Sequence, residues 1–216
     1  MKGYNEATDT YGSYIKDPAF IVPVAAGYAV WAKVNPRTVV FHGEANTGNI
    51  LSGVLQKTKN GYNLVGNPYP SPIDWEAMDK TGLSSTIWVW NGSQYATYTA
   101  GIGGTNGGSR YLSMGQGFFV QTLTENNVVS FTNNVRVAAL VNLKEMMAET
   151  DNVRIKISGG SLSDECIVAF RPGASNGYEP GRDAEKRYGS PDYPQIYTLA
   201  ENTKLTVNIL STDERK

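Results

Sequence analysis

The stretch IWVWNGSQYATY, residues 87–98, decides the fold class of this 216-residue chain. Aromatic and β-branched residues lie on both sides of Asn91-Gly92, and such residues favour a pleated, half-buried sheet surface. Asn-Gly supplies the positive φ angles of a two-residue type I′ turn, so the stretch predicts a β-hairpin. A turn at that pair places Trp90 opposite Ser93 and Trp88 opposite Tyr95.

Strand patterns of the same kind recur at short intervals on both sides of this hairpin. Each is a short run rich in Val, Ile, Tyr or Phe and is bounded by Gly, Pro or Asn, as is typical of strands and turns. The runs are residues 20–22, 27–32, 38–43, 49–55, 62–66, 117–121, 128–131, 153–158, 165–170, 195–199 and 204–210. Helix signals are limited to short candidates at 72–78 and 182–187 and a connector at 143–149. The sequence therefore predicts an all-β protein.

The order of these runs predicts the domain organisation. Residues 1–16 are polar and rich in Tyr, Gly and Thr, which predicts a linker or tail. Residues 17–145 are expected to form a β-sandwich of jelly-roll-like or immunoglobulin-like type. The pattern restarts after Asp151 with strict alternation over 153–158, so residues 151–216 are expected to form a second, smaller β unit that is short for a complete domain.

Composition excludes several classes of function. The formal net charge is −1 and no Lys/Arg cluster is present, which argues against nucleic-acid binding. No apolar run approaches the roughly 18 residues of a membrane span, so no membrane insertion is expected. The start of the chain has no apolar signal-peptide region.

The residues that usually carry catalysis or bind metals are scarce. The one cysteine, Cys166, lies in an apolar run and is expected to be a buried thiol. The single histidine, His42, lies in an alternating run and is expected to be structural. No zinc motif is present, and the glycine-rich stretch 101–108 has no Lys-Ser/Thr pair that opens a helix, so it is not a phosphate loop. We expect no cofactor, no metal and no catalytic residue.

Carboxylates leave one route to catalysis open. A glycosidase needs two carboxyl groups across a sugar-binding cleft, and the chain offers Asp74, Glu76, Asp164, Glu165 and Asp183. Turn and cap roles are commoner for such residues, so a glycoside-active enzyme ranks third among the functions considered. Calcium binding by Asp164, Glu165 and Asp183 lacks the spacing of an EF-hand.

Aromatic residues support a binding function. Flat aromatic faces on a sheet can stack on sugar rings, and the candidate glycan-binding residues are Trp88, Trp90, Tyr95, Tyr69 and Trp75. The alternative is that these side chains fill the core. Exposure of Trp88 and Trp90 distinguishes the two.

Residues 61–75, GYNLVGNPYPSPIDW, restrict the backbone strongly, since residues before proline avoid the α region. They resemble an NLVGNPYPSxIDW signature found in large secreted surface proteins of Bacteroidetes, many exported by the type IX system. Further segments resemble the same proteins in the same order: 41–48, 87–92, 115–120, 131–137, 176–178, 183–186, 196–198 and 205–208.

The resemblance implies an extracellular or outer-membrane location and a non-enzymatic region of a longer polypeptide. In this setting the signature is expected to be a rigid corner, with Asp74 capping a short helix and Trp75 plugging the core; a ligand-clasping loop is the alternative. The leading expectation is a structural or adhesion module, with a carbohydrate-binding module second. Its partners are expected to be glycans or other surface proteins, and an exposed edge strand in the second unit favours a homodimer.

Overall fold

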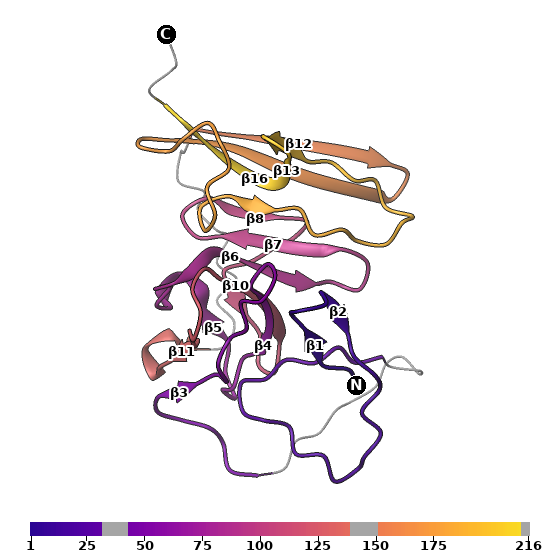
Figure 1. Cartoon of the computed structure of the whole chain (residues 1–216), viewed down its shortest axis with the longest axis vertical. Helices are drawn as coiled ribbons and strands as arrows, with labels where there is room; N and C mark the ends of the chain where they lie inside the picture. The colour runs from indigo at the N-terminus through magenta and orange to yellow at the C-terminus, as the bar shows by residue number, and fades with distance from the viewer. Residues whose placement is uncertain (32–42, 139–150, 213–216) are drawn as a thin grey trace. The chain divides into compact units, whose positions relative to one another are not determined.

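The computed structural model describes residues 1–31, 43–138 and 151–212, and within them all regular structure is β-strand apart from two short 3-10 helices (Figure 1). The predicted all-β class is confirmed, with several sheets in a sandwich-like fold. Residues 38–42 of the expected strand at 38–43, which include His42, and the connector at 143–149 lie outside the described residues.

The chain divides into two compact units that interleave in sequence. Unit 1 comprises Met1–Gly82 and Tyr111–Ala139, and unit 2 comprises Leu83–Arg110 and Leu140–Lys216. The hairpin region 83–110, expected within a sandwich of residues 17–145, therefore belongs to the unit that holds the C-terminal strands. The reason is long-range bonding, since the Ser85 amide donates to the Gly181 carbonyl (2.9 Å) and the Trp88 indole to the Glu185 carbonyl (3.2 Å).

Unit 1 consists of four antiparallel strand pairs. They are β1 (Tyr4–Asn5) with β2 (Thr10–Tyr11), β3 (Ile50–Leu51) with β11 (Ser130–Phe131), β4 (Tyr62–Gly66) with β10 (Gly117–Thr122), and β5 (Ile73–Asp74) with β9 (Tyr111–Leu112). The 3-10 helices are η1 (Trp75–Ala77) and η2 (Asn133–Val135). The predicted strands at 62–66 and 117–121 are confirmed, whereas 20–22 forms no strand and 49–55 forms only β3.

The N-terminal segment, expected to be a tail, is a hydrogen-bonded part of unit 1. Its β1–β2 hairpin places the Tyr4 ring 4.8 Å from that of Phe119. The buried carboxylate of Glu6 accepts hydrogen bonds from the amides of Thr58 (2.9 Å), Lys59 (2.8 Å) and Gly61 (2.7 Å). Burial raises the pKa of Glu6, but these amide hydrogen bonds together outweigh burial and hold it below its usual value.

Unit 2 contains the longest strands. In the first part β6 (Leu83–Trp90), β7 (Tyr95–Thr99) and β8 (Gly103–Thr105) pair antiparallel in sequence order. The rest forms a five-stranded sheet of β12 (Asn152–Gly159), β13 (Leu162–Arg171), β16 (Thr203–Ser211) and β14 (Ala184–Glu185) in that order, with β15 (Thr198–Ala200) also on β16. The helix expected at 182–187 is wrong, because Ala184 and Glu185 pair with β16.

The predicted hairpin at 87–98 exists, but its predicted register is wrong. Trp90 pairs with Tyr95, and Trp88 pairs with Thr97. The loop has four residues because the Asn91 side-chain oxygen accepts hydrogen bonds from the amides of Ser93 (3.1 Å) and Gln94 (3.0 Å). Asn91 therefore closes a wider turn with its side chain, which competes with a two-residue turn.

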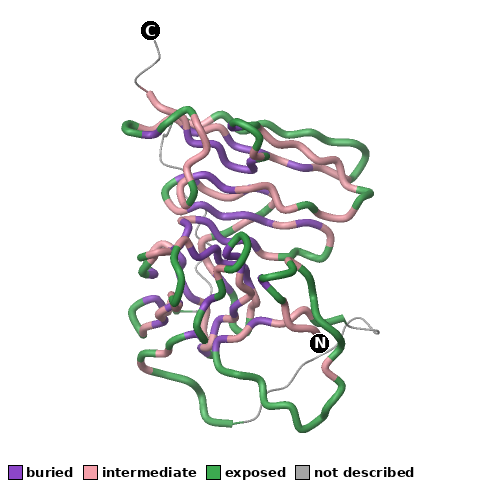
Figure 2. Tube along the Cα trace, viewed as in Figure 1, coloured by how far each residue is buried: buried purple, intermediate pink, exposed green. Residues whose placement is uncertain are grey.

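Buried residues run through both units, while β12 is exposed along nearly its whole length (Figure 2). Strand β12 is an edge strand: among the described strands it pairs only with β13. Exposure on both faces and an open edge therefore distinguish β12 from β13 and β16.

Candidate functional site

Three of the five predicted glycan-binding residues lie in the core. Trp75 and Trp88 have no exposed surface, and Tyr69 is 1% exposed. The Trp75 and Phe118 ring centroids are 6.4 Å apart, and the Tyr69 hydroxyl donates to the Gly48 carbonyl (2.6 Å). Burial raises the pKa of Tyr69. These side chains stabilise the fold and present no open face to a ligand.

The signature segment forms the corner that its prolines predict. The buried Asn67 side chain donates to the carbonyls of Ser71 (2.8 Å), Leu112 (3.3 Å) and Ser113 (3.0 Å). Its oxygen accepts from the Tyr69 amide (3.0 Å). One amide thus fixes the turn 67–71 to the end of β9, which favours the rigid corner over the ligand-clasping loop.

The helix cap predicted within the signature is present. Asp74 precedes η1 and its side chain accepts from the Glu76 amide (3.0 Å). Trp75 follows it and is buried, as expected. This use of Asp74 as a cap satisfies an amide that the short helix leaves without a backbone partner.

The two buried carboxylates of unit 2 are also held by the fold. Asp164 accepts hydrogen bonds from Lys186 Nζ (2.5 Å), the Ile196 amide (2.7 Å) and Asn106 Nδ2 (2.8 Å). Lys186 is itself 4% exposed at its side chain, so the ion pair lies inside unit 2. It joins β13 to the segment that follows β14.

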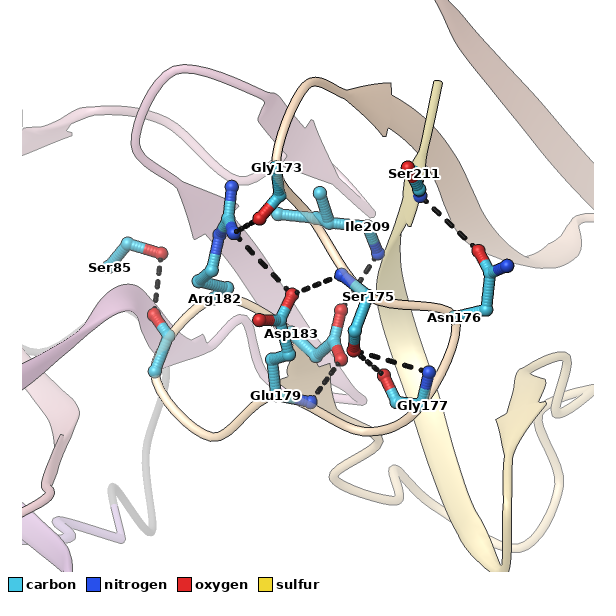
Figure 3. Close-up of polar contacts among 11 residues, drawn as sticks. Ser85, Gly173, Ser175, Asn176, Gly177, Glu179, Arg182, Asp183, Ile209 and Ser211 are labelled. Carbon is cyan, nitrogen blue, oxygen red and sulfur yellow. Dashed lines mark hydrogen bonds and ion pairs between the residues drawn. The ribbon is translucent and has the colours of Figure 1, made fainter. Parts of the chain in front are cut away.

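Asp183 lies at the centre of a loop network that Figure 3 shows. Its two carboxylate oxygens accept from the amides of Glu179 (2.8 Å) and Ile209 (2.8 Å). Burial raises the pKa of Asp183, and the two amide hydrogen bonds offset only part of that effect. Glu179 accepts from the Ser175 amide (2.9 Å) and lies 3.5 Å from Arg182 Nη1. The network ties the loop 173–183 to β16.

No group of three or more His, Cys, Asp and Glu side chains suited to a metal is found among residues 1–31, 43–138 and 151–212. Cys166 is buried as expected, and burial raises the pKa of its thiol. No helix among these residues is long and apolar enough to cross a membrane.

Unit 1 contains a cleft of about 350 Å³. The N-terminal hairpin, the stretch 52–56 and β4 line it. Glu6 is its charged lining residue, and the Glu6 oxygens accept the three backbone amides described above. None of the five predicted glycan-binding residues lines this cleft.

The other two predicted residues, Trp90 and Tyr95, form a surface pair in unit 2. Trp90 is 46% exposed, and its ring meets that of Tyr95 edge-to-face at a centroid distance of 5.2 Å. The Arg187 guanidinium lies 5.2 Å from the centroid of the Tyr95 ring. An aromatic pair with a cation beside it is suited to ligands that have an apolar face and a polar or charged group.

Tyr188, the residue after Arg187, takes part in a second aromatic–cation contact, which was not predicted. Lys204 Nζ lies 5.5 Å from the centroid of the Tyr188 ring and 4.9 Å from that of Tyr197. Contacts with Tyr188 and Tyr197 raise the pKa of Lys204, so its charge is kept at neutral pH. The sequence signal was the density of tyrosines over 188–197.

Comparison with known proteins adds no family to this description. The chain matches no protein-family model, and no curated protein and no solved structure is significantly similar to it.

Proposed function

We propose that the chain is a non-catalytic structural or adhesion module of a secreted or cell-surface protein. The resemblance of residues 61–75 to surface-protein sequences supports the location. The observation that carries the adhesion function is the open edge of β12.

Strand β12 presents an apolar row on one face. Val153, Ile155 and Ile157 alternate along it and are 50%, 39% and 44% exposed. An edge strand has a row of free backbone groups, and natural proteins usually protect such edges. Exposed apolar side chains beside that row are typical of a surface that pairs with another strand.

The opposite face of β12 is cationic. Arg154 Nη1 and Lys156 Nζ lie 2.9 Å and 3.3 Å from Glu165 carboxylate oxygens. Antiparallel pairing with a second copy, centred on Ile155, places Val153 opposite the second copy's Ile157. It also places Arg154 opposite the second copy's Lys156, so salt is expected to favour association by screening this repulsion.

Sedimentation velocity over a range of concentrations tests this proposal. We expect a dimer at high concentration that becomes more stable with added salt and is lost in Ile155→Lys. The matched control is Leu199→Lys, which introduces the same charge at a 60% exposed position on β15. A chain that stays monomeric at every concentration, or a control that dissociates equally, would overturn pairing through β12.

Carbohydrate binding is the second candidate, because Trp90 and Tyr95 form an accessible aromatic pair. A glycan array with the purified chain and with Trp90→Ala tests it. Binding that disappears in the variant supports the site. Silence across the array, with both proteins folded, removes this candidate and leaves adhesion through β12.

A further inference from the structure

Six side chains of unit 2 form two neighbouring aromatic–cation groups, which together we name the aromatic–cation patch. Its members are Trp90, Tyr95, Arg187, Tyr188, Lys204 and Tyr197, joined by ring–ring and cation–ring contacts and by the chain bond between residues 187 and 188. They come from β6, β7, the segment after β14, β16 and the residue before β15. The patch is therefore a product of the fold.

The backbone holds the central segment 186–190 at both ends. The Lys186 amide donates to the Lys204 carbonyl (2.8 Å), and the Ser190 amide donates to the Ser93 carbonyl (2.8 Å). A Cβ atom on Gly189 would lie 2.6 Å from Cβ of Gln94, so glycine permits the close approach to the 91–94 loop. Arg187 and Tyr188 are thus fixed between the hairpin loop and β16.

Three members of the patch are exposed and the other three are half-buried. Trp90 and Tyr188 are 46% and 48% exposed and Lys204 is exposed, whereas Tyr95, Arg187 and Tyr197 are half-buried. Its six members carry two cations and no carboxylate. Large aromatic side chains that are exposed and grouped together are typical of recognition surfaces.

The chemistry of the patch selects a class of ligand. Aromatic rings stack on the apolar faces of sugars, the planar guanidinium of arginine matches a carboxylate, and lysine supplies a point charge. We propose that the aromatic–cation patch binds an anionic polysaccharide whose sugar units carry carboxylates. This inference rests on the carbohydrate-binding function proposed above and specifies its ligand.

Calorimetric titration with polygalacturonate, and with neutral galactan as the uncharged comparison, tests the inference. We expect polygalacturonate to bind, galactan to bind at least about tenfold more weakly, and added salt to weaken the complex. Lys204→Gln and Trp90→Ala should each weaken polygalacturonate binding by about tenfold or more, the effect of one lost charge-assisted or stacking contact. Lys59→Gln, the same charge change at an exposed lysine of unit 1, should bind like the parent.

The outcomes separate the ligand class from the function it rests on. Equal binding of both polysaccharides that is lost in Trp90→Ala keeps the glycan function and overturns the anionic ligand. No binding of either polysaccharide, with the glycan array also silent, overturns both. Equal or tighter binding of single-stranded DNA with the same variant dependence would assign the patch to nucleic acid and overturn the inference. A cooperative thermal unfolding transition above the titration temperature shows that each variant is folded.

Discussion

Replacement of Trp88 by alanine should destabilise unit 2 far more than the same change two residues along the same strand. Trp88 has no exposed surface, whereas Trp90 keeps 46% of its surface exposed. Burial of a tryptophan removes on the order of 200 Å² from water, which at about 25 cal/mol/Å² stabilises the fold by about 5 kcal/mol. Trp90 buries about half as much, so its removal should cost about 2.5 kcal/mol.

Trp88→Ala also leaves the Glu185 carbonyl without the indole donor 3.2 Å away, which adds about 1 kcal/mol. The expected total of about 6 kcal/mol is comparable with the whole stability of a typical domain. Urea unfolding followed by circular dichroism measures both variants at one temperature. Equal midpoints for Trp88→Ala and Trp90→Ala, or a lower midpoint for Trp90→Ala, would refute the assignment of Trp88 to the core and Trp90 to the surface.

Three further predictions concern residues that make close contacts within the fold. Amide hydrogen bonds hold the pKa of Glu6 below its ordinary 4.5, so the stability that its carboxylate contributes is present above pH 4.5 and is lost as the pH falls through the lowered pKa. Glu6→Gln should therefore lower the free energy of unfolding by about 1–3 kcal/mol at neutral pH. The variant's thermal midpoint should also fall less steeply than the parent's as the pH is lowered. Lys186→Met should cost about 3–5 kcal/mol in urea unfolding by leaving the Asp164 charge buried, and no loss would contradict the inside location of the pair. Gly108→Ala should lower the thermal midpoint because its Cβ would lie 2.0 Å from the Thr97 carbonyl oxygen, whereas Gly159→Ala, with open space around it, should not.

The elements that the sequence predicted best are those set by local pattern. Strands β4, β10, β12 and β16 follow alternating or aromatic runs with turn residues at their ends. The N-terminal hairpin was missed because its stability comes from Glu6, whose partners lie more than fifty residues away at Thr58, Lys59 and Gly61. The hairpin register failed for a different reason, since the Asn91 side chain closes a wider loop than Asn-Gly alone predicts.

In the candidate site too, local sequence pattern was informative and long-range packing was not. Trp90 and Tyr95 were predicted as aromatic residues able to stack on sugars, although the predicted register did not pair them, and the structure places them in contact. Trp75, Trp88 and Tyr69 have the same residue types but are buried, because burial depends on long-range packing that residue type does not encode. Arg187 and Lys204 could not be assigned to the patch from sequence, because Arg187 reaches it by contact with Tyr95 of β7 and Lys204 by the pairing of β16 with β15.

The proposed adhesion function depends on pairing through the open edge of β12. Amide hydrogen exchange of β12, measured residue by residue by NMR at low and high protein concentration, reports on this pairing. Every second amide of an edge strand faces away from its neighbour and exchanges freely until another strand pairs with it. We expect these amides within Asn152–Gly159 to become protected as the concentration rises, with exchange in β13 unchanged. Identical exchange at both concentrations would contradict it.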